Sequence, residues 1–172
     1  VGDFVEDGRN LVVSNVGPVS SGWDRAVELY YQIKGGQVDY GKGHSNTYGI
    51  VRKPKNKRYK GLYPEWSIDN PIHIIGHSMG GQTARMLDYL LTSSISDTTG
   101  KKESNFLGNE QSGMIKSITT ISTPHNGTTL STFISAGIPF LQDMVAVAAV
   151  VGNSFYNFDL EQWGFAINQG ES

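Results

Sequence analysis

The sequence contains no cysteine, so disulfide frameworks and thiolate metal sites are both excluded. It also has little net charge: 16 acidic against 14 basic residues leave a formal charge of −2. A nearly neutral chain has no overall attraction to nucleic acid or to anionic membranes. The apolar run Met144–Val151 is too short to span a bilayer, which predicts no transmembrane segment. The start at Val1 lacks both a methionine and the pattern of a signal peptide, so we expect a mature or trimmed piece.

The residues that are present suit one globular domain. With 172 residues and 38% hydrophobic side chains, the chain can bury roughly two-thirds of its unfolded surface. Its 21 glycines indicate many tight turns.

A strand–turn–helix pattern around Ser78 carries the clearest chemistry. The β-branched run from Pro71 meets Gly76-His77-Ser78-Met79-Gly80, and a helix-forming segment follows from Gln82. This is the context of a nucleophile elbow, in which a serine sits on a sharp, strained turn between small neighbours. We therefore predict that Ser78 is a catalytic nucleophile and that the backbone N–H of Met79 binds an oxyanion.

Other segments predict strands and helices that alternate along the chain. Leu11–Val13 and Met114–Ser122 have the composition of strands. Ala26, Leu29, Tyr30 and Ile33 recur with a helical period, with Ser21 as N-cap and Gly35-Gly36 as the stop. A second helix from Gln82 to Leu91 presents one apolar face. Thr92–Ser112 is polar and reads as an exposed connection. The alternation predicts an α/β fold with a parallel sheet and crossover helices.

Two segments allow more than one interpretation. Val38–Lys60 shows no periodicity and carries six basic residues, Arg52, Lys53, Lys55, Lys57, Arg58 and Lys60. We expect a solvated loop in preference to a nucleic-acid surface, because only one aromatic residue is interleaved with the charges. Leu130–Phe155 is almost free of charge, which fits either a buried helix or an apolar lid over a lipid-binding cleft.

Several stretches together resemble the secreted lipases of the staphylococcal and thermoalkalophilic bacillary type. They occur in the family's order: Trp23–Ala26, Gly36–Gly41, Gly76–Leu87, Thr123–Thr129, Gln162–Gly164 and Gly170–Ser172. The resemblance implies a partial α/β-hydrolase fold with core strands and elbow in residues 1–128 and a lid-like segment in 129–155. It further implies secretion, a triacylglycerol or ester substrate at an oil–water interface, and Ser78 and Met79 in the roles given above.

The resemblance also implies metals. Family members bind a structural zinc through two Asp and two His, and Asp24 and His44 match one of each. The second His would fall at Ile50, which cannot bind a metal, and the second Asp would lie beyond Ser172. Because a tetrahedral site needs about four ligands, helix capping by Asp24 and an ordinary loop position for His44 are the favoured readings. Calcium, by the same resemblance, belongs to sequence not present here, and the ester chemistry needs neither metal.

The rest of a serine triad is not evident. After Ser78 the sequence has one histidine, His125, which could pair with Asp143 or Asp159. However, His125 directly follows a predicted strand, whereas the family's base follows the last strand, so the resemblance places both acid and base beyond Ser172. We therefore expect an internal part of a larger lipase that needs the remainder of its chain. A short-chain esterase or thioesterase, or a catalytically silent lipid-binding module, are the alternatives.

Overall fold

The computed structural model describes residues 10–17, 20–96, 99–104, 106–107 and 111–127. The lid-like segment 129–155 lies outside these residues. The chain divides into two compact units, one of residues 1–16 and 20–123 and one of residues 17–19 and 124–172. All helices and strands given below belong to the first unit.

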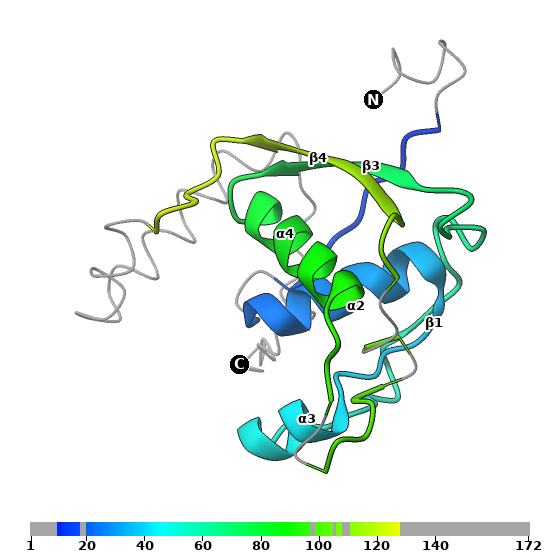
Figure 1. Cartoon of the computed structure of the whole chain (residues 1–172), viewed down its shortest axis with the longest axis vertical. Coiled ribbons are helices and arrows are strands. Elements are labelled where there is room, and N and C mark those ends of the chain that lie inside the picture. The colour runs from blue at the N-terminus through cyan, green and yellow to red at the C-terminus, as the bar shows by residue number, and fades with distance from the viewer. Residues whose placement is uncertain (1–9, 18–19, 97–98, 105, 108–110, 128–172) are drawn as a thin grey trace, which may run out of the picture. The chain divides into compact units, whose positions relative to one another are not determined.

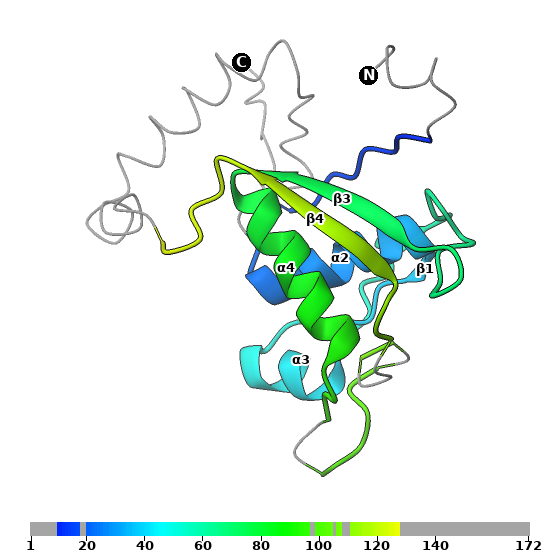
Figure 2. The same ribbon diagram turned by 45° about the horizontal axis from the view of Figure 1, so that its top comes forward.

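A parallel pair of strands joined by a crossover helix lies along one side of this unit (Figures 1 and 2). Strand β3, Ile72–His77, pairs in parallel with β4, Ile115–Ile121, and His77 lies opposite Ile121 at their carboxyl ends. Helix α4, Met79–Thr92, packs against both strands. The two strands predicted on either side of this helix and their parallel arrangement are confirmed, and α4 begins three residues before the predicted start at Gln82.

A second helix packs on α4. Helix α2, Gly22–Lys34, begins at Ser21, whose hydroxyl accepts a hydrogen bond from the Asp24 N–H, and it ends at Gly35 with φ of +92°. Both ends agree with the sequence prediction, since a Ser N-cap and a glycine stop are typical helix boundaries. The contact between α2 and α4 fixes the amino-terminal half of α2 close to the start of α4.

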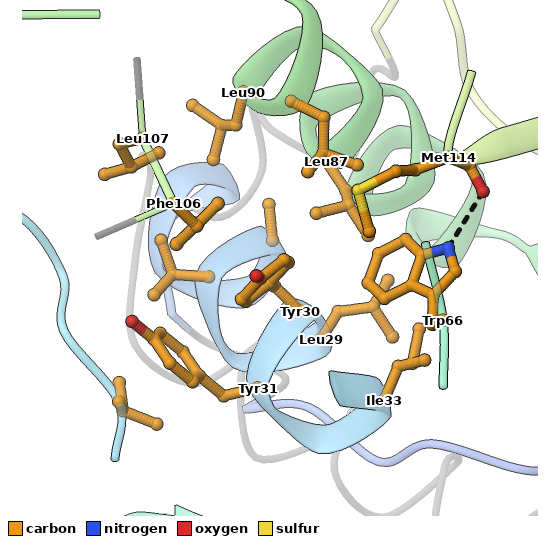
Figure 3. Close-up of a cluster of buried hydrophobic side chains, with 14 of the residues drawn as sticks. Leu29, Tyr30, Tyr31, Ile33, Trp66, Leu87, Leu90, Phe106, Leu107 and Met114 are labelled. Carbon is orange, nitrogen blue, oxygen red and sulfur yellow. Dashed lines mark hydrogen bonds between the residues drawn. The ribbon is translucent and has the colours of Figure 1, made fainter. Parts of the chain in front are cut away.

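The apolar core lies between these elements and the segment before β4 (Figure 3). The rings of Tyr30 and Phe106 stack with centroids 4.0 Å apart, and buried Trp66 donates a hydrogen bond of 2.8 Å to the Met114 carbonyl. The prediction that Thr92–Ser112 is an exposed connection is wrong at Phe106 and Leu107, which are fully buried. The stretch has only three apolar residues, Ile95, Phe106 and Leu107, which show no period, and tertiary packing buries the last two.

Short elements replace the irregular loop that was expected over Val38–Lys60. Strand β1, Gly36–Gln37, pairs antiparallel with β2, Arg58–Tyr59, and helix α3 spans Lys42–Tyr48. Helix α3 ends at Gly49, which adopts the left-handed conformation with φ of +65°. Elements of two and seven residues are too short to produce a recognisable hydrophobic period.

The predicted strand over Leu11–Val13 is not present. Residues 10–17 form neither helix nor strand, and the Leu11, Val12 and Val13 side chains are exposed. A strand needs a neighbour to satisfy its backbone hydrogen bonds, and in the described part of the chain β3 and β4 pair only with each other. This segment is held instead at Asn15, whose backbone N–H and carbonyl both bond to the Gln32 side chain. None of the described helices is long and apolar enough to cross a membrane.

Half of the basic cluster is engaged with acidic side chains of the same chain. Arg52 and Lys53 contact the carboxylate of Asp39, and Lys57 contacts that of Glu28. Arg52 binds Asp39 in a bidentate manner, with nitrogen–oxygen distances of 2.6 and 2.8 Å. The cluster is therefore partly a set of internal ion pairs, beyond the solvated loop that was expected.

The Asp39 carboxylate is expected to make stability depend on acid pH. Burial alone would raise the pKa of Asp39, but the hydrogen bonds from Arg52 and Gly41 and the charge of Lys53 lower it overall. The resulting stabilisation is complete above the pKa of the unfolded chain, about 4, and is lost as the pH falls through the lower folded pKa. In the full-length protein, Asp39→Asn should therefore lower the urea midpoint at pH 7 and flatten its decline below pH 4. Asp69→Asn, at an exposed carboxylate, is the control, and equal pH profiles for both variants would contradict the expectation.

Candidate active site

Ser78 occupies a sharp turn between β3 and α4. Its φ of +51° and ψ of −126° are strained for a residue with a side chain. Ser78 stands at the N-cap of α4, yet its hydroxyl makes no capping hydrogen bond. The hydroxyl oxygen of an N-cap serine ordinarily accepts a hydrogen bond from a helix N–H. Ser78 is half-buried. Its hydroxyl is not bound to the helix and is therefore available for another interaction.

The turn depends on two of the three glycines around Ser78 that the sequence suggested. A Cβ on Gly76 would lie 2.6 Å from the Gly80 carbonyl carbon and from the Gly81 nitrogen, both of which are backbone atoms. A Cβ on Gly81 would meet the Thr120 and Thr123 side chains at under 3 Å. At Gly80 no such atom lies within 4 Å. Close approach of strand and helix therefore requires Gly76 and Gly81, and the expected need for a small residue at Gly80 is not supported.

Backbone hydrogen bonds hold the strained residue from both sides. The Ser78 N–H donates to the Ile121 carbonyl at the end of β4, at 2.9 Å. The Ser78 carbonyl accepts from the Gly81 N–H at 3.2 Å. Strained conformations persist where the surrounding structure over-determines them. The position of Ser78 is accordingly fixed by the sheet as well as by its own turn.

The Met79 N–H is the first of helix α4. The first N–H groups of a helix have no acceptor within the helix and lie at the positive end of its dipole. Such a donor, next to a nucleophile, suits a developing oxyanion. Because the donor belongs to the backbone, the exposed Met79 side chain does not determine this property.

The histidines lie at separate places. His73 shares a hydrogen bond of 2.7 Å with the Ser117 hydroxyl across the sheet, and His77 is exposed beside Ser78. His125 lies in a turn of the second unit. Asp143 and Asp159 lie outside the described residues, so a pairing of either with His125 stays a prediction.

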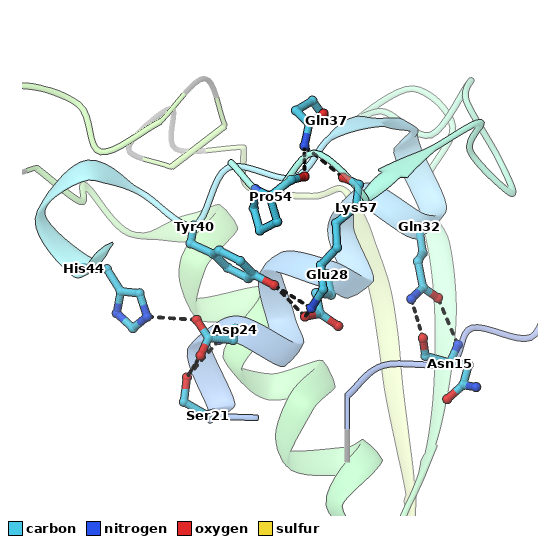
Figure 4. Close-up of polar contacts among 10 residues, drawn as sticks. All are labelled: Asn15, Ser21, Asp24, Glu28, Gln32, Gln37, Tyr40, His44, Pro54 and Lys57. Atoms are coloured by element: carbon cyan, nitrogen blue, oxygen red, sulfur yellow. Dashed lines mark hydrogen bonds and ion pairs between the residues drawn. The ribbon is translucent and has the colours of Figure 1, made fainter. Parts of the chain in front are cut away.

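The structure brings Asp24 and His44 together (Figure 4). His44 Nε2 lies 2.9 Å from Asp24 Oδ1, and the His44 ring stacks on Trp23 with centroids 4.9 Å apart. The Ser21 hydroxyl donates to the other carboxylate oxygen of Asp24 at 2.7 Å. Asp24 thus lies in the first turn of α2 beside the N-cap Ser21 and bonds to His44. His44 belongs to helix α3, so the loop position expected for it is wrong.

These residues do not by themselves make a zinc site. Ile50, at the position where the resemblance puts the second His, lines the same cavity of about 220 Å³ as Asp24, and its apolar side chain cannot bind a metal. Among the described residues no three His, Asp or Glu side chains are grouped to hold a metal ion. Two donors fall short of the four that structural zinc sites use.

Sequence reasoning missed two buried polar contacts near α2. Glu28 accepts hydrogen bonds from Tyr40 and Lys57 (Figure 4). Burial is the larger cause that raises the pKa of Tyr40, and the hydrogen bond to Glu28 is the next. Arg25 Nε donates to the Thr83 hydroxyl at 3.0 Å, joining α2 to α4 beside the elbow. The available signal was a pair of charged residues, Arg25 and Glu28, within the apolar pattern of α2.

Comparison with known proteins identifies relatives of the whole chain. Residues 1–172 match the family described as "Lipase-like, C-terminal domain". Lipase 1 of Staphylococcus aureus (strain MRSA252) is 39% identical over 179 residues, which cover 99% of this chain and 26% of that protein. The chain therefore spans about a quarter of the length of this curated relative.

Solved structures agree with the sequence match. Staphylococcus hyicus lipase superposes with a TM-score of 0.72 at 38% identity, over 97% of this chain and 44% of that one. Lipase 1 from Pelosinus fermentans gives a TM-score of 0.79 at 40% identity, over 99% and 47%. The parallel strands, crossover helix and strained turn described above are thus part of an α/β-hydrolase fold, and the chain belongs to the lipase-like, C-terminal domain family.

Proposed function

We propose that this chain supplies the nucleophile of a serine hydrolase that cleaves fatty-acyl esters, with triacylglycerols as the main substrates. The observation that carries the proposal is the strained, uncapped Ser78 at the start of α4. The relatives named lipase support the substrate class. In the proposed reaction Ser78 Oγ attacks the acyl carbonyl, and the tetrahedral oxyanion accepts a hydrogen bond from the Met79 N–H.

The proton of Ser78 must pass to a base and then to the departing alcohol. Water next attacks the acyl-enzyme, and the fatty acid leaves as the serine regains its proton. We propose that the base and its orienting acid belong to sequence beyond Ser172, in accord with the order Ser, acid, His of this fold. Residues 1–172 alone should consequently show little turnover, because Ser78 lacks the group that removes its proton.

Secretion and work at an oil–water interface belong to the same proposal. They rest on the resemblance to secreted lipases and on the nearly uncharged stretch Leu130–Phe155 as a lid. Zinc and calcium, where the full-length protein binds them, would act on stability, since acyl transfer proceeds through protein groups.

The full-length protein tests the proposal in two measurements. A fluorophosphonate should label Ser78, as located by peptide mass spectrometry, because such probes react with activated serines. Rates should be higher on an emulsified long-chain triacylglycerol than on a soluble short-chain ester. A preference for the soluble ester would favour an esterase or thioesterase, and an unlabelled, inactive protein would indicate a silent lipid-binding module.

A further inference from the structure

The side chain of Arg25 is charged and buried, although packing alone would be satisfied by an apolar side chain at this position. The residue is 8% exposed and lies on α2, on the side that faces α4. Burial lowers the pKa of Arg25, and the nearby charge of Glu28 raises it. Buried ion pairs can often be replaced by apolar side chains at no loss of stability. Stability is therefore a weak explanation for this arginine.

The hydrogen bonds of Arg25 lead to the residue that supplies the proposed oxyanion donor. Arg25 Nε donates to the Thr83 hydroxyl at 3.0 Å, and that hydroxyl donates to the Met79 carbonyl at 3.0 Å. A hydroxyl has one proton and two lone pairs. Since Arg25 can only donate, it occupies a lone pair of Thr83 and leaves the proton for Met79.

These two successive hydrogen bonds restrain the carbonyl group of Met79. On the other side Ser78 is held by the Ile121 carbonyl at 2.9 Å, as described above. The Met79 N–H therefore lies between two anchored peptide groups, one tied to β4 and one tied to α2. A preorganised donor contributes more to an oxyanion than one that must reorient.

Resting on the proposed function, we propose that Arg25 and Thr83 are positioning residues, which fix Met79 so that its N–H points at the oxyanion. Neither residue touches the reacting atoms. The positive guanidinium of Arg25 on α2 bonds to Thr83 near the start of α4, where the helix dipole is also positive. Both favour a negative charge at the start of α4.

The test compares two threonines of the same helix in the full-length protein. Thr83→Val keeps the shape but removes the hydroxyl, and should lower kcat for ester hydrolysis about tenfold with little change in KM. Thr92 also bonds to the carbonyl four residues earlier, Asp88 O at 2.8 Å, but at the far end of α4. Thr92→Val should leave kcat unchanged. Thr83→Ser, which restores the hydroxyl, should recover most of the rate.

Arg25→Met extends the test, with the melting temperature of the variant measured in parallel. A folded Arg25→Met should lose rate as Thr83→Val does, and combining the two changes should cost little more than either one, because both break the same chain. Wild-type kcat in folded Thr83→Val, or equal losses in Thr92→Val, would overturn the positioning role alone. A wild-type protein that neither hydrolyses esters nor labels at Ser78 would overturn the proposed function and this role with it.

Discussion

Ser78→Ala should reduce kcat for ester hydrolysis in the full-length protein by about 10⁶-fold, the size typical of removing a nucleophilic serine. Without Oγ no acyl-enzyme can form, while binding and the oxyanion donor remain and give a small residual rate. Folding should be nearly unaffected, because the hydroxyl makes no capping bond with α4. The measurement is turnover of an emulsified triacylglycerol together with the thermal midpoint. A long-chain ester still cleaved at the wild-type rate would show that another residue is the nucleophile.

Ser122 provides a matched control for this substitution. It follows β4 as Ser78 follows β3, and it is the other described non-glycine residue with positive φ, at +50°. Ser122→Ala places alanine in a comparable backbone conformation at the neighbouring strand end. Activity and fluorophosphonate labelling should persist in Ser122→Ala and vanish in Ser78→Ala.

Gly76→Ala should destabilise the full-length protein and inactivate it as well. The added Cβ would meet backbone atoms of Gly80 and Gly81 at 2.6 Å, so the strand or the helix must shift. Such overpacking costs about 1–3 kcal/mol, and a displacement of about 1 Å at the nucleophile can reduce the rate about 100-fold. Urea unfolding and ester turnover would measure both effects.

Gly80→Ala is the control for stability. Gly80 lies in α4, and its φ is not positive. The new Cβ would have no atom within 4 Å outside its own helix turn. Alanine in a helix is more favourable than glycine by about 0.5–1 kcal/mol. The two variants should therefore shift the urea midpoint in opposite directions, and equal destabilisation would contradict the role given to Gly76.

The sequence predicted the elements whose signal is local. The cap at Ser21, the stop at Gly35, the helical period of α2 and the glycine-flanked Ser78 all depend on residues close in the chain. The last of these features places Ser78, the proposed nucleophile. The order of β3, α4 and β4 and their parallel pairing also followed, because a strand–helix–strand alternation permits few arrangements.

Long-range packing could not be obtained in this way. Phe106 is buried by Tyr30, far away in the chain, and nothing in its polar surroundings shows this. The strand prediction for Leu11–Val13 was wrong for the converse reason, since apolar composition cannot supply a neighbouring strand. The bond between Arg25 and Thr83 needed both helices in place. The sequence related Asp24 to His44 only by resemblance, and their direct hydrogen bond was not foreseen.

The hydrogen bond from Ser78 to Ile121 makes one amide proton a probe of the whole site. Its acceptor belongs to a strand that follows β3 only after α4 and the connection beyond it. The proton can exchange with solvent only when the carboxyl end of β4 separates from the turn, which is also when the strained φ of Ser78 loses its support. Hydrogen exchange at this single amide therefore measures how often Ser78, the proposed nucleophile, leaves its strained conformation, independently of any substrate.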